Sequence, residues 1–418
     1  MPSKQPTTVR ASARIADVRY EIRGELARRA AELEAAGREI VKLNIGNPGL
    51  FGFAVPEHVR EAIAANLVRS EAYCHQKGIL SARLAIVEQL HAHGVAAAHS
   101  DRVFIGNGVS ELIDLALRTL LDPGDEVLLP SPDYPLWSAA TTLNGGRPIY
   151  YPCPAERAHL PDADEIEALI TPRTRALVII NPNNPTGAVY PAALLEKLVR
   201  IAERHRLTLL SDEIYDEILY DGAHFVPLAR LAGDVPCLTF DGLSKVQRAC
   251  GYRVGWLSLT GAPALLGEIE HGLDLLASLR LCANVPGQWA IAPSLRGIDT
   301  ISLLTAPGGR LHESRRAVIE ACEQSRFLDL VTPHGAMYAF PSVNRDAIAD
   351  FDDDDFALEL LEQENVLVVP GSGFNHTSRN HFRITLLPQA AQLREVFSRV
   401  ERVLERTAEA GVLERDVA

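Results

Sequence analysis

The 418-residue sequence has no apolar run long enough to cross a membrane and no excess of basic charge. Its longest apolar runs, such as Ala176–Ile180, fall far short of the roughly 18 residues that a transmembrane helix needs. The chain has 54 Asp and Glu against 41 Lys and Arg, a net charge of −13 at pH 7, and no concentrated basic patch that would attract phosphate backbones or anionic lipids. The sequence therefore predicts a protein without a membrane or nucleic-acid partner.

Cysteine is sparse and scattered. The six cysteines form no C-x-x-C pair, and no histidine stands at the spacing of a zinc site, so no metal is expected. Free thiols in a reducing compartment explain them better than disulfides do. The first sixteen residues contain three basic residues and no acid, as an organelle transit peptide does, but a short disordered extension is the preferred interpretation; the lack of an apolar core excludes a secretory signal. We expect a cytoplasmic location.

From about residue 100, short apolar strand patterns alternate with amphipathic helix patterns. Such alternation is typical of an α/β fold with a largely parallel sheet. The predicted strands are Val103–Ile105, Glu126–Leu129, Pro148–Tyr151, Ala176–Ile180, Thr208–Ser211, Cys237–Phe240 and Val254–Leu259, and the helices between them are Ser110–Leu121, Ala192–His205 and Leu265–Leu279.

After Pro307-Gly308-Gly309 the pattern becomes that of a smaller α+β domain. The acidic run Asp352–Asp355 predicts a helix start, favoured by the helix dipole, rather than a metal site. We expect an N-terminal extension and segment packing on the small domain (1–60), a large domain (61–306) and a small C-terminal domain (307–418). The small domain should contain a helix at Arg310–Ser325, strands near Met337–Phe340, Val366–Val369 and Phe382–Leu386, and a closing helix to about Arg406, while the N-terminal segment has its own helix at Gly24–Ala36.

Two glycine-rich loops are incomplete as nucleotide-binding motifs. Gly106-Asn107-Gly108 and Gly371-Ser372-Gly373 each lack the third glycine of a dinucleotide fingerprint, which argues against a nicotinamide dehydrogenase. The first loop nevertheless lies between a predicted strand and a predicted helix, where backbone N–H groups and the Ser110 hydroxyl could bind an anion. A tight turn capped by Ser110 is the alternative.

Three successive predicted strands end in polar residues. Asn184 follows the strand Ala176–Ile180, and Asp212 and Tyr215 follow the strand Thr208–Ser211. Lys245 follows the strand Cys237–Phe240, and Arg253 comes eight residues after that lysine. Each residue alone could be structural, but parallel strands bring their carboxyl ends to one edge of the sheet, where ligands bind in open α/β folds. The convergence indicates an active site at that edge.

A lysine on a strand-end loop can form a Schiff base with a carbonyl compound. If that compound is pyridoxal 5′-phosphate, Asp212 would hold the ring nitrogen protonated, and Asn184 and Tyr215 would donate to the ring oxygen. Tyr134 would lie over the ring. The phosphate would bind to Gly108, Val109, Ser110, Ser244 and Arg253.

The order and spacing of these motifs resemble those of fold type I, class I/II aminotransferases, which depend on pyridoxal 5′-phosphate, from Ile40 to about Leu386. The narrower resemblance is to bacterial glutamate–pyruvate (alanine) aminotransferases. The motifs are Asn183-Asn184-Pro185-Thr186-Gly187, Asp212-Glu213-Ile214-Tyr215, Ser244-Lys245 and Gly251-Tyr252-Arg253-Val254-Gly255-Trp256, and the narrower likeness lies in residues 42–48, 105–112, 179–190 and 280–286.

The resemblance implies a seven-stranded, mainly parallel sheet between helices, a small α+β domain and a homodimer. It implies that Lys245 carries the cofactor and that Arg383 binds the substrate α-carboxylate, with Gly46 and Asn184 nearby. It also implies that Tyr73 reaches the phosphate of the neighbouring subunit. Residues Val246–Cys250 depart from the family pattern. Arg280 could approach a distal carboxylate, but a structural role is the preferred interpretation.

The implied activity moves an amino group between an L-amino acid, alanine first, and a 2-oxo acid such as 2-oxoglutarate or pyruvate. Another amino donor such as valine, or a lyase, decarboxylase or oxidase reaction on the same cofactor, stays open as an alternative. A non-catalytic binding protein is disfavoured because the lysine, acid and arginine set is complete.

Overall fold

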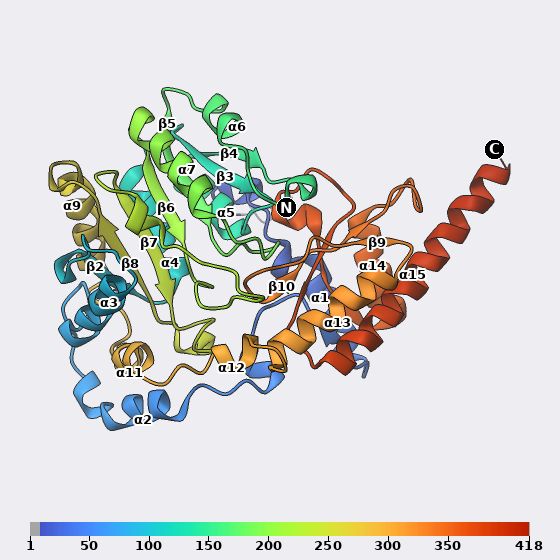
Figure 1. The fold of residues 1–418 in the computed structure, drawn as a ribbon, viewed down its shortest axis with the longest axis horizontal. Helices are drawn as coiled ribbons and strands as arrows, with labels where there is room; N and C mark the ends of the chain where they lie inside the picture. Colours follow the sequence, from blue (N-terminus) through green and yellow to red (C-terminus); the bar gives the residue numbers. More distant parts are fainter. Residues whose placement is uncertain (1–8, 418) are drawn as a thin grey trace, which may run out of the picture.

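A computed structural model describes residues 9–417, the last seven of them by their backbone alone. Its centre is a seven-stranded sheet in the order β2-β8-β7-β6-β5-β3-β4 (Figure 1). Only β8 in this sheet runs antiparallel to its neighbours, so the predicted mainly parallel sheet is confirmed. The strands are β2 (Val103–Gly106), β3 (Glu126–Ser131), β4 (Arg147–Pro152), β5 (Thr174–Ile180), β6 (Thr208–Asp212), β7 (Cys237–Gly242) and β8 (Gly255–Thr260).

Helices cover both faces of this sheet because alternate side chains of its central strands point to opposite sides. On β5, Val178 and Ile180 enter one buried cluster, whereas Leu177 and Ile179 enter the other. The first cluster is completed by helices α4 (Val109–Leu120), α5 (Pro135–Leu143) and α9 (Pro263–Leu279). The second includes α3 (Leu80–Ala92), α6 (Ala163–Ala168), α7 (Ala192–His205), α8 (Leu228–Leu231) and α11 (Ile291–Arg296).

A second body follows, at the opposite side of the molecule from α9 (Figure 1). Its core packs α13 (Arg310–Gln324) and α14 (Asp353–Glu364) against the long α15 (Ala390–Val417). The predicted strand Val366–Val369 is wrong as one element, because the chain passes from one sheet to another there. β12 (Val366–Leu367) pairs with β1 (Val41–Lys42), and β13 (Val369–Pro370) pairs with β14 (Phe382–Thr385). The other short strands are β9 (Leu328–Asp329), β10 (Tyr338–Ala339) and β11 (Ser342–Val343).

The N-terminal segment is joined to this second body. Helix α1 (Glu25–Ala35) packs against α14, with Leu33 and Leu361 in one buried cluster. Residues 13–16, expected to be disordered, lie instead in a 3₁₀ helix, η1 (Ala13–Asp17), that contacts α5; residues 1–8 of the expected extension lie outside the described residues. The domain boundaries stay a prediction. The remaining helices are α2 (Glu57–Ala65), α10 (Val285–Gln288) and α12 (Ser302–Thr305). Within residues 9–417, no helix has the length and apolarity to span a membrane.

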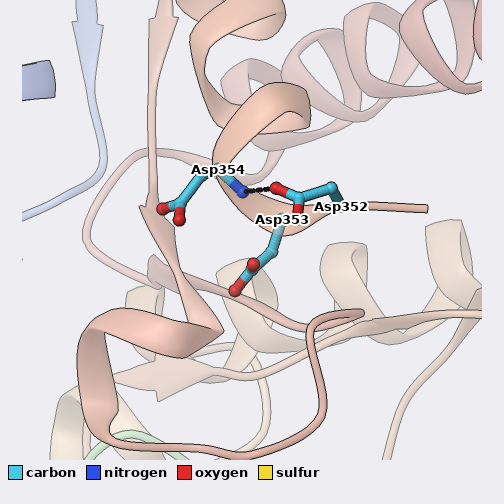
Figure 2. A group of neighbouring side chains, drawn as sticks. All are labelled: Asp352, Asp353 and Asp354. Carbon is cyan, nitrogen blue, oxygen red and sulfur yellow. Dashed lines mark hydrogen bonds between the residues drawn. The ribbon is translucent and has the colours of Figure 1, made fainter. Parts of the chain in front are cut away.

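The acidic run begins α14, as predicted (Figure 2). Asp352 caps the helix, and its Oδ1 accepts hydrogen bonds from the backbone N–H groups of Asp354 and Asp355 at 3.0 and 3.2 Å. The Arg379 guanidinium lies 2.7, 3.3 and 2.8 Å from the carboxylates of Asp352, Asp353 and Asp354. The three acids, which lie close enough together to suggest a metal site, thus already share a cationic side chain.

Candidate active site

A cavity of about 560 Å³ lies at the carboxyl ends of the parallel strands and is closed partly by the second body. It collects most of the site residues predicted from the sequence. These are Gly46, Val109, Ser110, Tyr134, Asn184, Asp212, Tyr215, Ser244, Lys245, Arg253 and Arg383. Gly108 adjoins them at the N-cap of α4, whereas Tyr73 does not line the cavity.

Asp212 is a buried carboxylate on the cavity floor. It ends β6, where its backbone is held in register between Ile180 and Phe240. One oxygen, Oδ2, accepts a hydrogen bond from Trp137 Nε1 at 3.0 Å, and the other, Oδ1, is buried without a hydrogen-bond partner among the described residues. Burial raises the pKa of Asp212 to about 6, against the opposing effects of the Trp137 bond, the backbone N–H of Ile214 and the charge of Lys245. The free oxygen is therefore suited to a cationic N–H donor.

Lys245 projects into the cavity from the loop after β7. Its Nζ donates to the Gly46 carbonyl at 2.9 Å. Tyr215 donates from its hydroxyl to the Tyr338 hydroxyl at 3.2 Å. Burial disfavours the Tyr338 phenolate, but the charges of Lys245 and Arg383 outweigh it and lower the pKa of Tyr338. A Cβ on Gly46 would overlap the Tyr338 hydroxyl, so glycine is required for this close approach.

An anion-binding corner is formed where α4 begins. Gly108 has a φ of +86°, and a Cβ there would run into the Arg253 guanidinium. Arg253 itself is held by a bond from Nη1 to the Cys250 carbonyl at 2.9 Å. Ser110 and Ser244 line the cavity beside it. Backbone N–H groups at a helix start, two hydroxyls and a guanidinium together form a site suited to phosphate.

Arg383 is a fully buried cation on β14. Its Nη1 donates to Asn184 Oδ1 at 3.0 Å, and its Nη2 donates to the Asn44 carbonyl. The guanidinium carbon lies 4.4 Å from the Tyr338 ring centroid and 4.7 Å from that of Phe374. Burial lowers the pKa of Arg383, and its Nε has no hydrogen-bond partner within the described part of the chain. A buried, oriented guanidinium with a free donor is suited to binding a carboxylate.

Several cavity residues have no signal in the sequence. Tyr338 lies on a two-residue strand. Trp137, inside α5, does not line the cavity but contacts the site through its hydrogen bond to Asp212. Tyr20 and Arg23 come from the N-terminal segment, where the Tyr20 hydroxyl lies 3.5 Å from that of Tyr134. Cys250, within the departure from the family pattern, also lines the cavity.

Two further sequence candidates lie elsewhere. Tyr73 is 79% exposed and takes no part in the cavity of its own chain. Arg280 donates to the Ile105 carbonyl at 2.7 Å and lies 3.6 Å from Glu111, contacts that agree with the structural role preferred from the sequence, which stays a prediction.

Comparison with known proteins adds to this geometry. A family model described as aminotransferase class I and II matches residues 38–400. The chain belongs to the class I and II aminotransferase family. As a class I and II aminotransferase it is an enzyme that transfers amino groups, and it has the fold on which this family uses pyridoxal 5′-phosphate.

Individual class I and II aminotransferases match over nearly the whole chain. A glutamate-pyruvate aminotransferase, AlaA, from Haemophilus influenzae is 46% identical over 393 residues, which cover 94% of this chain and 97% of the relative. An aminotransferase structure from Escherichia coli has a TM-score of 0.93 at 44% identity, covering 96% of this chain and 99% of the other. An alanine aminotransferase from Pyrococcus furiosus has a TM-score of 0.90 at 36% identity, covering 95% and 100%.

Proposed function

We propose that this aminotransferase moves the amino group between alanine and 2-oxoglutarate, with pyridoxal 5′-phosphate bound to Lys245. The observation that carries the proposal is the convergence of Lys245, Asp212 and Arg383 on one cavity. The names of the relatives from Haemophilus influenzae and Pyrococcus furiosus support alanine, glutamate and pyruvate as substrates.

The residues present fit the cofactor. The unpartnered Oδ1 of Asp212 would accept from the ring nitrogen, and the corner formed by Ser110, Gly108 and Arg253 would hold the phosphate. Asn184 and Tyr215 would donate to the ring oxygen, with Tyr134 over the ring. When bound, the protonated ring would withdraw electrons from the substrate Cα.

Lys245 and Arg383 would divide the remaining work. With the cofactor bound, the Lys245 amine would take the proton from the substrate Cα and deliver it to the cofactor carbon that had been the aldehyde. Its bond to the Gly46 carbonyl orients Nζ within the cavity. Arg383 would bind the α-carboxylate and so determine which Cα bond faces Lys245. Lys245 would thereby transfer the proton, and Arg383 would orient the substrate for that transfer.

Assays of purified enzyme loaded with pyridoxal 5′-phosphate test this function against the alternative reactions. We expect alanine to be consumed beyond one equivalent per active site only when a 2-oxo acid acceptor is present, because each further amino transfer needs an acceptor. Pyruvate and glutamate should form in equal amounts from alanine and 2-oxoglutarate. Release of ammonia or carbon dioxide without an acceptor would instead indicate a lyase, oxidase or decarboxylase. If valine were turned over much faster than alanine, the proposed amino donor would be valine and not alanine.

We further propose a cytoplasmic homodimer built from a large domain (61–306) and a small domain (307–418). Free cysteines, three of them buried, support the reducing location. The exposed Tyr73, together with Leu279 and Leu281, which are 74% and 53% exposed, supports a surface covered by a second chain. In a symmetric dimer such sharing would be reciprocal, with each Tyr73 reaching the partner's phosphate.

Complementation tests this sharing. Chains with Lys245→Ala and chains with Tyr73→Ala, each nearly inactive, are refolded together. If Tyr73 acts in the partner's site, each mixed dimer has one intact site and one doubly altered site, so we expect up to about half of the normal activity per mixed dimer. If Tyr73 acts within its own chain, every site keeps one defect. Absence of recovery with mixed dimers present would therefore contradict the sharing.

A further inference from the structure

One cation in the cavity has no role in the function proposed above. Among residues 9–417, four basic side chains line the cavity: Arg23, Lys245, Arg253 and Arg383. The last three are accounted for by the cofactor aldehyde, the phosphate and the substrate α-carboxylate. Arg23 remains. It belongs to the N-terminal segment and not to any of the loops that follow the sheet strands.

The backbone of Arg23 is anchored although its side chain is exposed. It ends the 3₁₀ helix η2 (Glu21–Arg23), in which Ile22 is buried in a cluster with Phe340 and Phe374. The Ile22 carbonyl accepts a hydrogen bond from Asn44 Nδ2 at 3.0 Å. The segment therefore fixes the backbone of Arg23 at the cavity wall, and its side chain reaches the cavity from there.

Asn44 links the two arginines. Its side chain donates to the residue before Arg23, and its backbone carbonyl accepts from Arg383 Nη2. Arg23 and Arg383 are thus positioned by one residue on the same cavity. Such an arrangement can bind two carboxylates at once, one at each end of a short carbon chain.

Arg23 has no anionic partner of its own among the described residues. On the same segment Arg19 pairs with Glu21 at 3.6 Å, whereas Arg23 forms neither an ion pair within 4.0 Å nor a side-chain hydrogen bond there. An arginine that lines a cavity and is not paired with a carboxylate is available to bind a ligand.

The surroundings of Arg23 favour an anion. Together with Ile45 and Asn47, it also lines a neighbouring cavity of about 810 Å³. Among the described residues of its wall, Glu39 is acidic and Lys42, Arg310 and Arg399 are further basic residues. Lys42 and Arg399 pair with Glu34 and Glu395 at 2.7 and 2.6 Å, whereas Arg310, like Arg23, forms no ion pair within 4.0 Å in the described part of the chain. Arg23 and Arg310 are therefore the cations there that an anionic substrate could reach.

We propose that Arg23 binds the distal carboxylate of the five-carbon dicarboxylate substrates, glutamate and 2-oxoglutarate, while Arg383 holds their α-carboxylate. This assignment rests on the proposed function. Alanine and pyruvate have no distal carboxylate, so Arg23 contributes to one half-reaction and not to the other. Arg23 thereby determines how one site accepts both a short and a long substrate.

The test separates the two half-reactions in the cofactor-loaded enzyme. In Arg23→Gln, kcat/KM should fall about ten- to hundredfold for glutamate and 2-oxoglutarate, because one charge-assisted contact is lost. For alanine and pyruvate it should stay within about threefold. Arg23→Lys should restore part of the loss. Arg28→Gln is the matched control, because Arg28 lies on the same segment in an exposed pair with Glu25.

Calorimetry supplies a readout without turnover. Glutarate should bind the wild type more tightly than butyrate, and Arg23→Gln should remove most of that preference. Equal losses for all four substrates, or no loss for the dicarboxylates, would overturn the assignment. If the wild type fails to transaminate alanine, the proposed function fails by itself, and the glutarate preference still decides whether Arg23 binds a distal carboxylate.

Discussion

Lys245→Ala is expected to lower alanine–2-oxoglutarate turnover by at least about 10⁴-fold. The substitution removes both the amine that binds the cofactor aldehyde and the base that moves the Cα proton. No other lysine lines the cavity within the described chain. Initial rates of pyruvate and glutamate formation measure the loss, and small amines such as methylamine should restore part of it by acting as a soluble base.

Two further variants separate chemistry from charge and folding. Lys245→Arg keeps the positive charge but cannot act as a neutral base, so it should be nearly as slow as Lys245→Ala. Lys197→Ala, an exposed position on α7, should leave turnover unchanged. Turnover of Lys245→Ala within about tenfold of the wild type, with unchanged thermal unfolding, would remove Lys245 from its proposed role.

The second large effect is expected at Asp212. Asp212→Asn should lower turnover by about 10²- to 10³-fold, because an amide cannot balance a protonated ring nitrogen. The pKa of about 6 leaves this buried carboxyl mainly ionised at pH 7, and a neighbouring ring cation would favour that form further. Asparagine is nearly isosteric and its amide oxygen can still accept from Trp137, so the variant should fold and bind the cofactor.

The adjacent acid provides a matched control for Asp212. Glu213 is also buried, but its Oε1 accepts from Ser211 and from the backbone N–H of Leu228, and it does not line the cavity. Glu213→Gln should therefore affect stability more than turnover. A Glu213→Gln variant as slow as Asp212→Asn would point to a general effect of buried charge rather than to a specific contact with the ring.

The sequence alone predicted the centre of this site because that centre follows strand ends. Asn184, Asp212 and Lys245 come after three adjacent parallel strands, and parallel pairing brings such ends to one edge. Strand patterns of only four or five residues were enough to place those strands. The prediction that these three residues lie close together did not depend on the exact lengths of the strands.

The outer wall of the cavity could not be predicted in this way. Tyr20 and Arg23 reach the cavity from a segment whose only regular structure nearby is a three-residue helix, and Tyr338 comes from a two-residue strand. Such short elements have no hydrophobic period, and their positions depend on packing against distant parts of the chain. Trp137 was missed for another reason, since a tryptophan in an apolar helix is usually only core.

Reduction of the cofactor-loaded wild-type enzyme with borohydride, followed by peptide mapping, tests the central assignment most directly. Borohydride fixes an imine as a stable secondary amine on the lysine that holds it. We expect the pyridoxyl group on Lys245, in the peptide that contains Ser244. Modification of any other lysine should not increase in parallel with the loss of activity. A stoichiometric adduct on another lysine, such as Lys42 or Lys77, would contradict the assignment.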